Sequence, residues 1–437
     1  MKISIFGLGY VGAVSAACLA AHGHEIVGVD SNSTKVDLIN AGTAPIVEDQ
    51  VGELIARARA ESRLSATNSV SDAVRKTSVS IVCVGTPSQL NGNLDLSFVR
   101  RVCEEIGQSL RDKREFHVIV IRSTILPGSM RNVVIPMLEA SSGKIAGKDF
   151  GVCNNPEFLR EGTAVFDYNH PPKTVIGETD SLAGDVLVKL YSHLDAPLIR
   201  TSIEIAEMAK YVDNNWHALK VLFANEIGSL CKALNIDSHK VMDIFCQDTK
   251  LNLSSYYLKP GFAFGGSCLP KNVRALSYTA KYLDLNLPVL NAITPSNDRQ
   301  IQNAFDMIVK AAHRRIGILG FAFKAGIDDL RVSPMVNIIE RLIGKGYDLR
   351  IYDRNVRLAS LSGANRDYIL NHIPHISRLM MDSATEVAEF AQTLVIGNNA
   401  AEFAAVLTGA HADQVVIDLV RLSNTAPSRC DYRGISW

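Results

Sequence analysis

The stretch Gly7-Leu8-Gly9-Tyr10-Val11-Gly12 follows a short apolar run at residues 3–6 and opens a segment with the composition of a helix. A second apolar run, at residues 25–29, comes next and ends at Asp30. A strand, a G-x-G-x-x-G turn, a helix and a strand that ends in an acid are typical of a βαβ unit that binds a dinucleotide. The spacing therefore predicts the first crossover of a parallel sheet, with a pyrophosphate at the N-terminus of its helix.

Each glycine of this turn has its own predicted role. Gly7 permits the tight turn, Gly9 lets the backbone approach the pyrophosphate, and Gly12 allows the helix to pack closely on the strand. Asp30 is expected to bond the ribose 2′-hydroxyl and to repel a 2′-phosphate, which favours NAD over NADP. A glycine turn that serves packing alone is the alternative. The predicted cofactor residues of this unit are Gly7, Gly9, Tyr10, Val11, Gly12, Asp30 and Lys35, with the lysine at the adenosine end.

Short apolar runs alternate with helical patterns along the first half of the chain, which indicates a doubly wound parallel sheet. The predicted strands are residues 3–6, 25–29, 79–84, 118–121 and 174–176. Between about 202 and 234 the helical spacing continues without proline. A helix of about 30 residues exceeds the usual globular length, so we expect it to join two domains or to form a subunit interface. After about residue 313 the alternation resumes, with predicted strands at 315–319, 348–352, 393–396 and 415–417.

These patterns predict an α/β fold with two doubly wound Rossmann-like domains joined by a long central helix. We expect an NAD-binding domain at 1–200, a central helical linker and dimerisation region at 201–300, and a second α/β domain at 301–437. The second domain lacks G-x-G-x-x-G, so a second dinucleotide is not expected there. Ligands of such sheets bind beyond the carboxyl ends of the strands, where Thr86 and Thr124 follow two predicted strands.

The composition narrows the classes of partner. The 437 residues include 45 Lys+Arg and 45 Asp+Glu, so the formal net charge is zero and favours neither nucleic acid nor a membrane surface. No apolar run reaches the ~18 residues of a membrane helix, and the chain starts in a strand rather than a signal peptide, which predicts a cytoplasmic protein. None of the eight cysteines has C-x-x-C spacing, so we expect no disulfide framework and no metal.

Three segments carry residues suited to chemistry. In the first, Cys268 follows paired glycines, so its backbone is approachable, and a neighbouring lysine or helix N-terminus would favour the thiolate. A loop thiol is the alternative. In the second segment, Asn155 and a following proline have the pattern of a helix start, which would bring Glu157 and Glu161 one turn apart on one face. An ordinary solvated acidic face is the alternative for this pair.

The third segment lies in the long predicted helix. Lys210, Asn214 and His217 recur at helical spacing and form a polar stripe in an otherwise apolar helix. Polar groups in such a position face either a cleft or buried partners. Three different hydrogen-bonding types indicate a site rather than a simple solvent face.

These segments belong to a larger set of motifs that spans most of the chain. The set is GLGYVG at 7–12, VGTP at 84–87, RST at 122–124, NPEFLREG at 155–162, AEMAKYVDNNWHALK at 206–220, GFAFGGSCLPK at 261–271 and FKAGIDDLRVSP at 323–334. In this order the motifs closely resemble the UDP-glucose/GDP-mannose dehydrogenase family. The residues at 216–217, 252, 256–257 and 262–264 are most similar to those of the GDP-mannose branch of that family.

The resemblance implies oxidation of a primary alcohol of GDP-mannose to a carboxylate with two NAD. It implies that Cys268 traps the aldehyde as a thiohemiacetal and then carries a thioester, because a covalent bond retains a reactive aldehyde between two cofactor-binding events. By similarity, Lys210 and Asn214 stabilise the oxyanion, and Glu161 and Thr124 position water or relay protons. The implied nucleotide-sugar residues are Glu157, Phe158, Leu159, Lys210, Asn214, His217, Asn252, Tyr256, Tyr257, Lys259, Phe262 and Lys324; further cofactor contacts are Thr86, Thr124, Lys271 and Arg331.

Four positions depart from the family pattern. Asn272 stands where the family usually has an Asp that assists proton removal through water, and an amide cannot ionise. Lys259 replaces an Arg of the GDP-mannose branch that reaches the partner subunit's site, which implies at least a homodimer, and it keeps the charge without the bidentate fork. Ile327 replaces a Thr, and Asp213 adds a charge beside Asn214. The substitution at Asn272 is expected to affect the turnover rate more than the choice of substrate.

Three other functions are compatible with parts of this pattern. A UDP-glucose 6-dehydrogenase or another sugar-nucleotide 6-dehydrogenase would share the chemistry and differ in the pocket. A β-hydroxyacid dehydrogenase also has a lysine on a long helix, but it would need neither Cys268 nor the second α/β domain. A nucleotide-sugar-binding protein with weakened catalysis is suggested by Asn272. The NAD-dependent oxidation of GDP-mannose remains the favoured hypothesis, with an alginate-like exopolysaccharide as the pathway that the product suggests.

Overall fold

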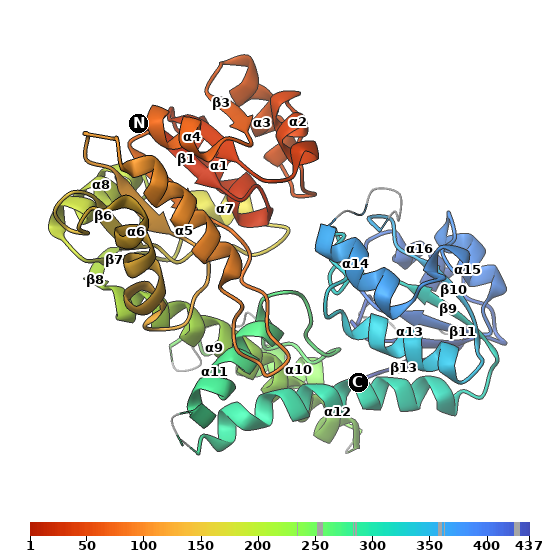
Figure 1. Ribbon diagram of the computed structural model, residues 1–437. Coiled ribbons are helices and arrows are strands. Elements are labelled where there is room, and N and C mark those ends of the chain that lie inside the picture. The colour runs from red at the N-terminus through yellow and green to blue at the C-terminus, as the bar shows by residue number, and fades with distance from the viewer. Residues whose placement is uncertain are drawn as a thin grey trace. The chain divides into compact units, whose positions relative to one another are not determined.

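The computed structural model describes residues 1–437 except 234, 251–256, 283, 285, 357–360, 362 and 424–428. The chain forms two compact units, Met1–Asp213 and Asn214–Trp437, and each unit has its own sheet (Figure 1). Helix α9 (Ile203–Ala233) contributes residues to both units. Among the described helices, none is long and apolar enough for a bilayer crossing.

An eight-stranded sheet in the order β3-β2-β1-β4-β5-β6-β7-β8 forms the centre of the first unit. Its strands are parallel apart from the antiparallel pair β6 and β7. They are β1 (Lys2–Phe6), β2 (Glu25–Val29), β3 (Leu64–Thr67), β4 (Val79–Val82), β5 (Val118–Ile121), β6 (Gly151–Asn154), β7 (Thr174–Glu178) and β8 (Leu198–Ser202). The predicted strands are confirmed, whereas β3, β6 and β8, each with only two apolar residues, were not predicted.

Helices cover both faces of this sheet, as the predicted doubly wound fold requires. Along β5, Val118 and Val120 belong to the core under α1, α3 and α8, whereas Ile119 and Ile121 belong to the core under α4, α5 and α6. All four are buried because the strand is covered on both sides. The helices are α1 (Tyr10–Ala21), α2 (Ser33–Asn40), α3 (Val51–Ala60), α4 (Val70–Lys76), α5 (Ser97–Leu110), α6 (Ile135–Ser142), α7 (Ala164–Asn169) and α8 (Ser181–Tyr191), with a π-helical turn at Met130–Val134.

Helix α9 confirms the long predicted helix, with 31 residues. Its buried positions recur at helical spacing but include several polar residues, among them Lys210 and Asn214, which are 5% and 6% exposed. Several of its large apolar residues are exposed instead: Ile205 61%, Met208 39%, Val212 56% and Trp216 43%. The polar stripe predicted from the sequence therefore lies on the buried side, and a stripe of apolar residues lies on the exposed side.

A five-stranded parallel sheet in the order β10-β9-β11-β12-β13 forms the centre of the second unit. Its strands are β9 (Arg315–Leu319), β10 (Asp348–Tyr352), β11 (Thr393–Ile396), β12 (Val415–Asp418) and β13 (Asp431–Gly434), of which the last was not predicted. The described helices are α10 (Ser238–Phe245), α11 (Leu269–Tyr282), α12 (Pro288–Lys310), α13 (Pro334–Gly344), α14 (Gly363–His372), α15 (Ala384–Phe390) and α16 (Phe403–Thr408), with a 3₁₀ turn at Ile376–Arg378.

The second sheet repeats the turn geometry of the first without its sequence motif. Gly7 after β1 has φ +91° and its neighbour Leu8 donates its N–H to Asp30 at 2.7 Å. Gly320 after β9 has φ +92°, and Asp353 after β10 accepts the N–H groups of residues 321 and 322 at 2.8 and 3.0 Å. A glycine directly after one strand and an aspartate directly after the next would have revealed this second turn.

Candidate active site

The glycine-rich turn has the form that the sequence predicts. A Cβ atom at Gly12 would lie 1.8 Å from the Gly7 carbonyl oxygen, so no larger residue fits this crossing of helix and turn. A Cβ at Gly9 would meet nothing within 4 Å, so the space before the first turn of α1 is open to a ligand. Open space at a helix N-terminus, bounded by exposed backbone, suits the pyrophosphate of NAD.

The acid of this unit is built into the same turn. Asp30 accepts the N–H of Leu8 at 2.7 Å and that of Asn32 at 2.9 Å, and Lys35 lies 3.6 Å from its Oδ2. The side chain of Asp30 is 11% exposed, so its position is set by the backbone rather than by solvent. A fixed carboxylate at the end of β2 fits the predicted recognition of a ribose. Beyond β4 and β5, the Thr86 hydroxyl donates to the Thr124 carbonyl at 2.8 Å and joins the two predicted turns.

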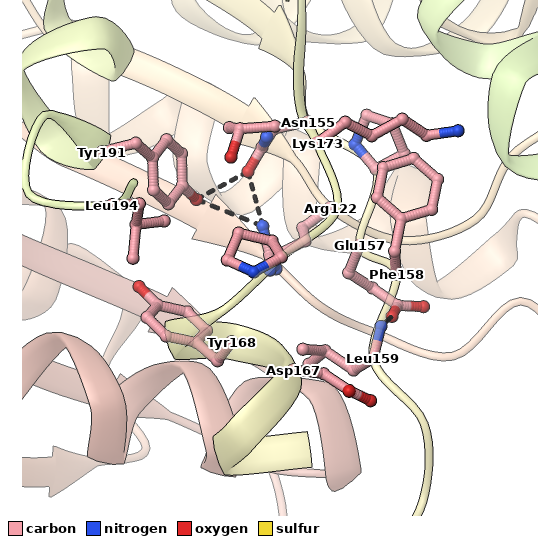
Figure 2. Close-up of a pocket in the computed structure, with 13 residues that line it drawn as sticks. Arg122, Asn155, Glu157, Phe158, Leu159, Asp167, Tyr168, Lys173, Tyr191 and Leu194 are labelled. Carbon is pink, nitrogen blue, oxygen red and sulfur yellow. Dashed lines mark hydrogen bonds between the residues drawn. The ribbon is translucent and has the colours of Figure 1, made fainter. Parts of the chain in front are cut away.

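A buried arginine links three strands of the first unit. Arg122, directly after β5, donates to Asn155 Oδ1 at 2.6 Å and to the Tyr191 hydroxyl at 3.1 Å, and Tyr191 donates to the same Oδ1 at 2.6 Å (Figure 2). Asn155 donates in turn to the Val175 carbonyl at 2.9 Å. This network fixes the turn that carries Thr124 relative to the segment that carries Glu157. It was not predicted, because its members are far apart in the chain.

The predicted helix start at Asn155 is wrong. Residues 155–160 form no helix, and α7 begins at Ala164. The reason is that the Asn155 side chain is used by Arg122, Tyr191 and Val175, so it cannot cap a following helix. Glu157 and Glu161 therefore do not lie one helical turn apart, and each has its own environment.

Glu157 forms a buried ion pair with Lys210. Its Oε1 lies 3.0 Å from the Lys210 ammonium, and both side chains are 7% exposed. Its Oε2 accepts the Leu159 N–H at 2.7 Å. Burial alone would raise the pKa of Glu157, but the charge and hydrogen bond of Lys210 and the bond from Leu159 together hold that pKa below its ordinary value. The Glu157 carboxyl is therefore ionised at neutral pH and fixes the position of the Lys210 side chain.

An aromatic ring lies near the cation of this pair and near that of a second pair. The ring of Phe158 has the Lys210 ammonium 5.6 Å from its centroid and the Lys173 ammonium 4.8 Å from it, within the range of a cation–π interaction. Lys173 pairs with Asp213 at 2.9 Å. Asp213, which departs from the family pattern, thus balances a charge next to the predicted site instead of adding an unpaired one. The sequence contained no signal for this pairing.

In the second unit, buried amides hold the loop that carries Cys268. Asn225 on α9 accepts the Gly261 N–H at 2.8 Å and donates to the Phe262 carbonyl at 3.2 Å. Asn297 on α12 makes the same pair of bonds with Phe264, at 2.9 and 3.0 Å, and a neighbouring amide, Gln300, donates to the Gly261 carbonyl at 2.6 Å. Side-chain amides replace a neighbouring strand here, so the loop has a defined shape without belonging to a sheet. Amides on apolar helix faces are the sequence signal that was overlooked.

Cys268 itself is exposed and directly precedes α11. The two glycines before it pack on the 323–334 segment: a Cβ at Gly265 would lie 2.5 Å from Pro334 Cδ, and one at Gly266 would lie 2.6 Å from the ring of Phe323. Gly266 also has φ +84°. The paired glycines are therefore required by packing as well as by the turn. Lys271 lies in the first turn of α11.

Asn272, the main departure from the family pattern, is 1% exposed on α11. Neither polar atom of its side chain has a hydrogen-bond partner among the described residues. Asn214 is also buried, and its Nδ2 has no hydrogen-bond partner among the residues that the structure describes. Two buried amides with unused donors and acceptors can accommodate a ligand or an ordered water without rearrangement.

The remaining predicted substrate residues belong to the second unit, as does Arg331, which was predicted as a cofactor contact. His217 stacks on Tyr257 with centroids 4.9 Å apart, and the Lys220 ammonium lies 5.4 Å from the same ring. Lys259 is exposed, 3.8 Å from Asp243. Arg331 makes a two-pronged ion pair with Asp329, and Lys324 lies in the same 323–334 segment. The predicted residues Asn252 and Tyr256 lie outside the described residues.

A parallel sheet with this first turn, an aspartate fixed at the end of β2 and an exposed cysteine at a helix start define a class, the NAD-dependent dehydrogenases. The chain belongs to the UDP-glucose/GDP-mannose dehydrogenase family. Residues 1–195 match the NAD binding domain of the family, 204–299 its central domain and 317–425 its UDP binding domain. The predicted family, fold class and cofactor are confirmed.

Individual relatives match this chain over its full length. The chain is 55% identical over 438 residues to GDP-mannose 6-dehydrogenase of Pseudomonas putida, covering 100% of both. A solved ternary complex of GDP-mannose dehydrogenase from Pseudomonas aeruginosa is 53% identical with a TM-score of 0.58, covering 100% of both chains. A UDP-glucose dehydrogenase from Pyrobaculum islandicum is 30% identical with a TM-score of 0.90, covering 100% of this chain and 97% of that one.

Proposed function

We propose that the chain oxidises the primary alcohol of GDP-mannose to the carboxylate of GDP-mannuronate with two NAD. The observation that carries this proposal is the 55% identity, over the whole length of both chains, to a GDP-mannose 6-dehydrogenase. The UDP-glucose dehydrogenase of known structure is 30% identical, so the nucleotide sugar of the GDP-mannose branch is favoured.

In the proposed reaction NAD supplies the hydride acceptor for two successive oxidations. The Cys268 thiolate adds to the aldehyde carbon and gives a thiohemiacetal, which the second oxidation converts to a thioester. Water then attacks the thioester carbonyl carbon while Glu161 takes its proton, the C–S bond breaks, and Cys268 leaves as the thiolate. The ammonium of Lys210 and the amide of Asn214 stabilise the oxyanion. The buried pair with Glu157 supports this role of Lys210, because it holds the ammonium in place.

We assign the ligands to the three predicted regions. Residues 1–200 hold NAD through the glycine turn, the Asp30 carboxylate and the turns at Thr86 and Thr124. Residues 201–300 link the domains, and residues 301–437 hold the nucleotide of the substrate through Lys324, with Arg331 at the cofactor. These boundaries and roles are part of the proposal.

The protein is proposed to act as a homodimer or a higher homo-oligomer. The exposed stripe of α9, made of Ile205, Met208, Val212 and Trp216, supports this, because large apolar residues rarely form a continuous exposed patch on a monomer. A second copy of the helix would cover it. We place the reaction in the cytoplasm, where NAD and nucleotide sugars are available, and the product in the synthesis of an alginate-like exopolysaccharide.

Two alternatives are tested against this proposal. A UDP-glucose 6-dehydrogenase would use the same residues with another nucleotide sugar. A binding protein with weakened catalysis would bind NAD and GDP-mannose but need Asn272→Asp for turnover, since the family carboxylate is absent at that position.

The test is a side-by-side assay of NADH formation with GDP-mannose and UDP-glucose. We expect kcat/KM for GDP-mannose to be higher by at least about a hundredfold. Cys268→Ser is expected to abolish GDP-mannuronate, whereas Cys246→Ser, at a half-buried thiol of the same unit, serves as the matched control. Preference for UDP-glucose, or turnover that appears only in Asn272→Asp, would replace the proposal by the corresponding alternative.

A further inference from the structure

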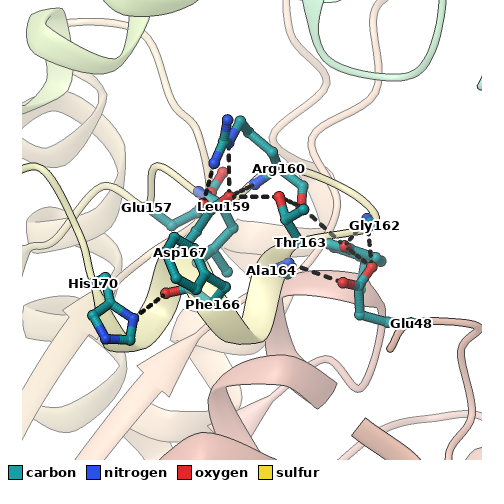
Figure 3. Close-up of polar contacts among 11 residues, drawn as sticks. Glu48, Glu157, Leu159, Arg160, Gly162, Thr163, Ala164, Phe166, Asp167 and His170 are labelled. Atoms are coloured by element: carbon teal, nitrogen blue, oxygen red, sulfur yellow. Dashed lines mark hydrogen bonds and ion pairs between the residues drawn. The ribbon is translucent and has the colours of Figure 1, made fainter. Parts of the chain in front are cut away.

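A half-buried carboxylate outside all of the motifs accepts two backbone N–H groups that follow Glu161 in the chain. Glu48, in the loop before α3, accepts the Gly162 N–H on Oε2 at 2.7 Å and the Ala164 N–H on Oε1 at 2.8 Å (Figure 3). It lies 114 residues before Gly162 in the chain. The contact is therefore set by the fold and not by local sequence.

The same carboxylate reaches the dinucleotide-binding helix. The hydroxyl of Tyr10, the first residue of α1, donates to Glu48 Oε2. That hydroxyl also lies 3.3 Å from the Gly162 nitrogen and 3.5 Å from the Arg160 carbonyl oxygen. Burial, with Glu48 and Glu161 nearby, raises the pKa of Tyr10, so its hydroxyl keeps the proton that it donates. One carboxylate thus joins the start of the cofactor helix to the residues next to Glu161.

Two further carboxylates hold the N-terminal side of the turn formed by residues 159–163. Asp167 accepts the Arg160 N–H and its guanidinium Nε, both at 2.9 Å, and Glu157 accepts the Leu159 N–H at 2.7 Å. These bonds come from neighbouring residues. On the C-terminal side Asp167 also accepts the Thr163 hydroxyl at 3.2 Å, whereas the backbone N–H groups of residues 162 and 164 are bonded to Glu48. Gly162 has φ +86°, a left-handed conformation that glycine adopts readily, and its N–H bond to Glu48 maintains this conformation after Glu161.

We propose that Glu48 is a positioning residue, which fixes Glu161 relative to the dinucleotide-binding turn through its bonds to Tyr10, Gly162 and Ala164. This inference rests on the proposed function, in which Glu161 takes the proton of the attacking water. Glu48 acts on thioester hydrolysis through the backbone N–H groups of residues 162 and 164, which follow Glu161 in the chain. It acts less on hydride transfer, in which Glu161 accepts no proton from water.

The experiment separates these steps in the full-length protein. Glu48→Gln keeps the size of the side chain but loses the charge and one of the two oxygens that accept backbone N–H groups. Rapid-quench measurement with GDP-mannose and NAD gives the first hydride transfer, and mass spectrometry of Cys268 gives the accumulated thioester. Glu53→Gln, at an exposed glutamate of α3, is the matched control.

We expect Glu48→Gln to slow thioester hydrolysis by about tenfold, the rate equivalent of one charge-assisted hydrogen bond. The thioester should then accumulate, while the first hydride transfer changes less than about twofold. Tyr10→Phe, which leaves both backbone bonds of Glu48 in place, should give a smaller loss in the same direction and serves if Glu48→Gln does not fold.

Hydrolysis at the unmodified rate in these variants would overturn the inference. An equal fall in both steps, or a lower melting temperature with unchanged kinetics, would also overturn it, because Glu48 would then support the fold alone. The proposed function is tested separately: if the unmodified protein forms no thioester and no second NADH, that function fails, whatever the Glu48 variants do.

Discussion

Replacement of Glu157 by glutamine tests the buried ion pair on which the position of Lys210 depends. Glutamine has nearly the same shape, and its Oε1 can still accept the Leu159 N–H that Glu157 accepts at 2.7 Å. The change removes the charge that lies 3.0 Å from the Lys210 ammonium. Lys210 would then be a buried cation beside the Phe158 ring, without its carboxylate partner.

The expected cost follows from this distance and from the burial of both side chains. Two charges 3.0 Å apart attract by about 5 kcal/mol at an effective dielectric constant of roughly 20. Breaking one side of such a buried pair costs about 3–5 kcal/mol, because the remaining charge loses its compensation. Lys210→Met should have a similar cost. The double variant should cost less than the sum by at least about 2 kcal/mol, since it leaves neither charge behind.

The assay is urea unfolding of the full-length protein, followed by hydrogen exchange of peptides that contain β5 and β6. The pKa of Glu157 is held below its ordinary value, so its contribution to stability is present above pH 4.5 and is lost as the pH falls through the folded-state pKa. The difference between Glu157→Gln and the unmodified protein should therefore be largest at neutral pH and shrink below pH 4.5. Additive costs, with a coupling below about 0.5 kcal/mol, would refute the ion pair.

Three further predictions concern the turn, the cysteine loop and a buried acid. Gly12→Ala places a Cβ 1.8 Å from the Gly7 carbonyl oxygen, so calorimetry should find the NAD affinity reduced by at least about a hundredfold. An unchanged affinity would contradict the close packing of α1 on the glycine turn. Asn225→Ala leaves a backbone N–H and a carbonyl of the cysteine loop without their hydrogen bonds, at a cost of about 2 kcal/mol. Iodoacetamide should therefore react with Cys268 at an altered rate, and an unaltered rate would contradict the support of the loop by Asn225. Burial raises the pKa of Glu207 from 4.5 to about 7, so its stabilising contribution is full below pH 4.5 and is lost as the pH rises through 7. Melting temperatures of Glu207→Gln should therefore decline less between pH 5 and pH 8 than those of the unmodified protein, and parallel curves would count against this acid.

Much of the fold could be predicted because its strands are buried on both faces. The runs at β4, β5 and β11 are mostly apolar, so they could be recognised without any structure. The sequence could not predict β3 or β8, whose stability comes from pairing with a neighbour at the edge of the sheet. The turn at Gly320 was missed because Asp353, rather than a G-x-G-x-x-G motif, organises it.

The site could be predicted where a residue type is itself unusual. A cysteine after paired glycines and a lysine on an apolar helix indicate chemistry without knowledge of their neighbours. The supporting contacts could not be predicted, because the order of strands in the sheet brings together residues that are remote in sequence. Arg122 and Tyr191 are 69 residues apart, and Glu48 and Ala164 are 116 apart. Asn155 shows the same limit, since its local pattern indicated a helix cap and its distant partners prevented one.

The most direct test of the proposed four-electron oxidation is the amount of NADH formed per GDP-mannose consumed by the purified protein at completion. A thioester on Cys268 that is hydrolysed to a carboxylate requires two oxidations, so the ratio should be two, with GDP-mannuronate as the product. A ratio of one, with free aldehyde released, would contradict the account.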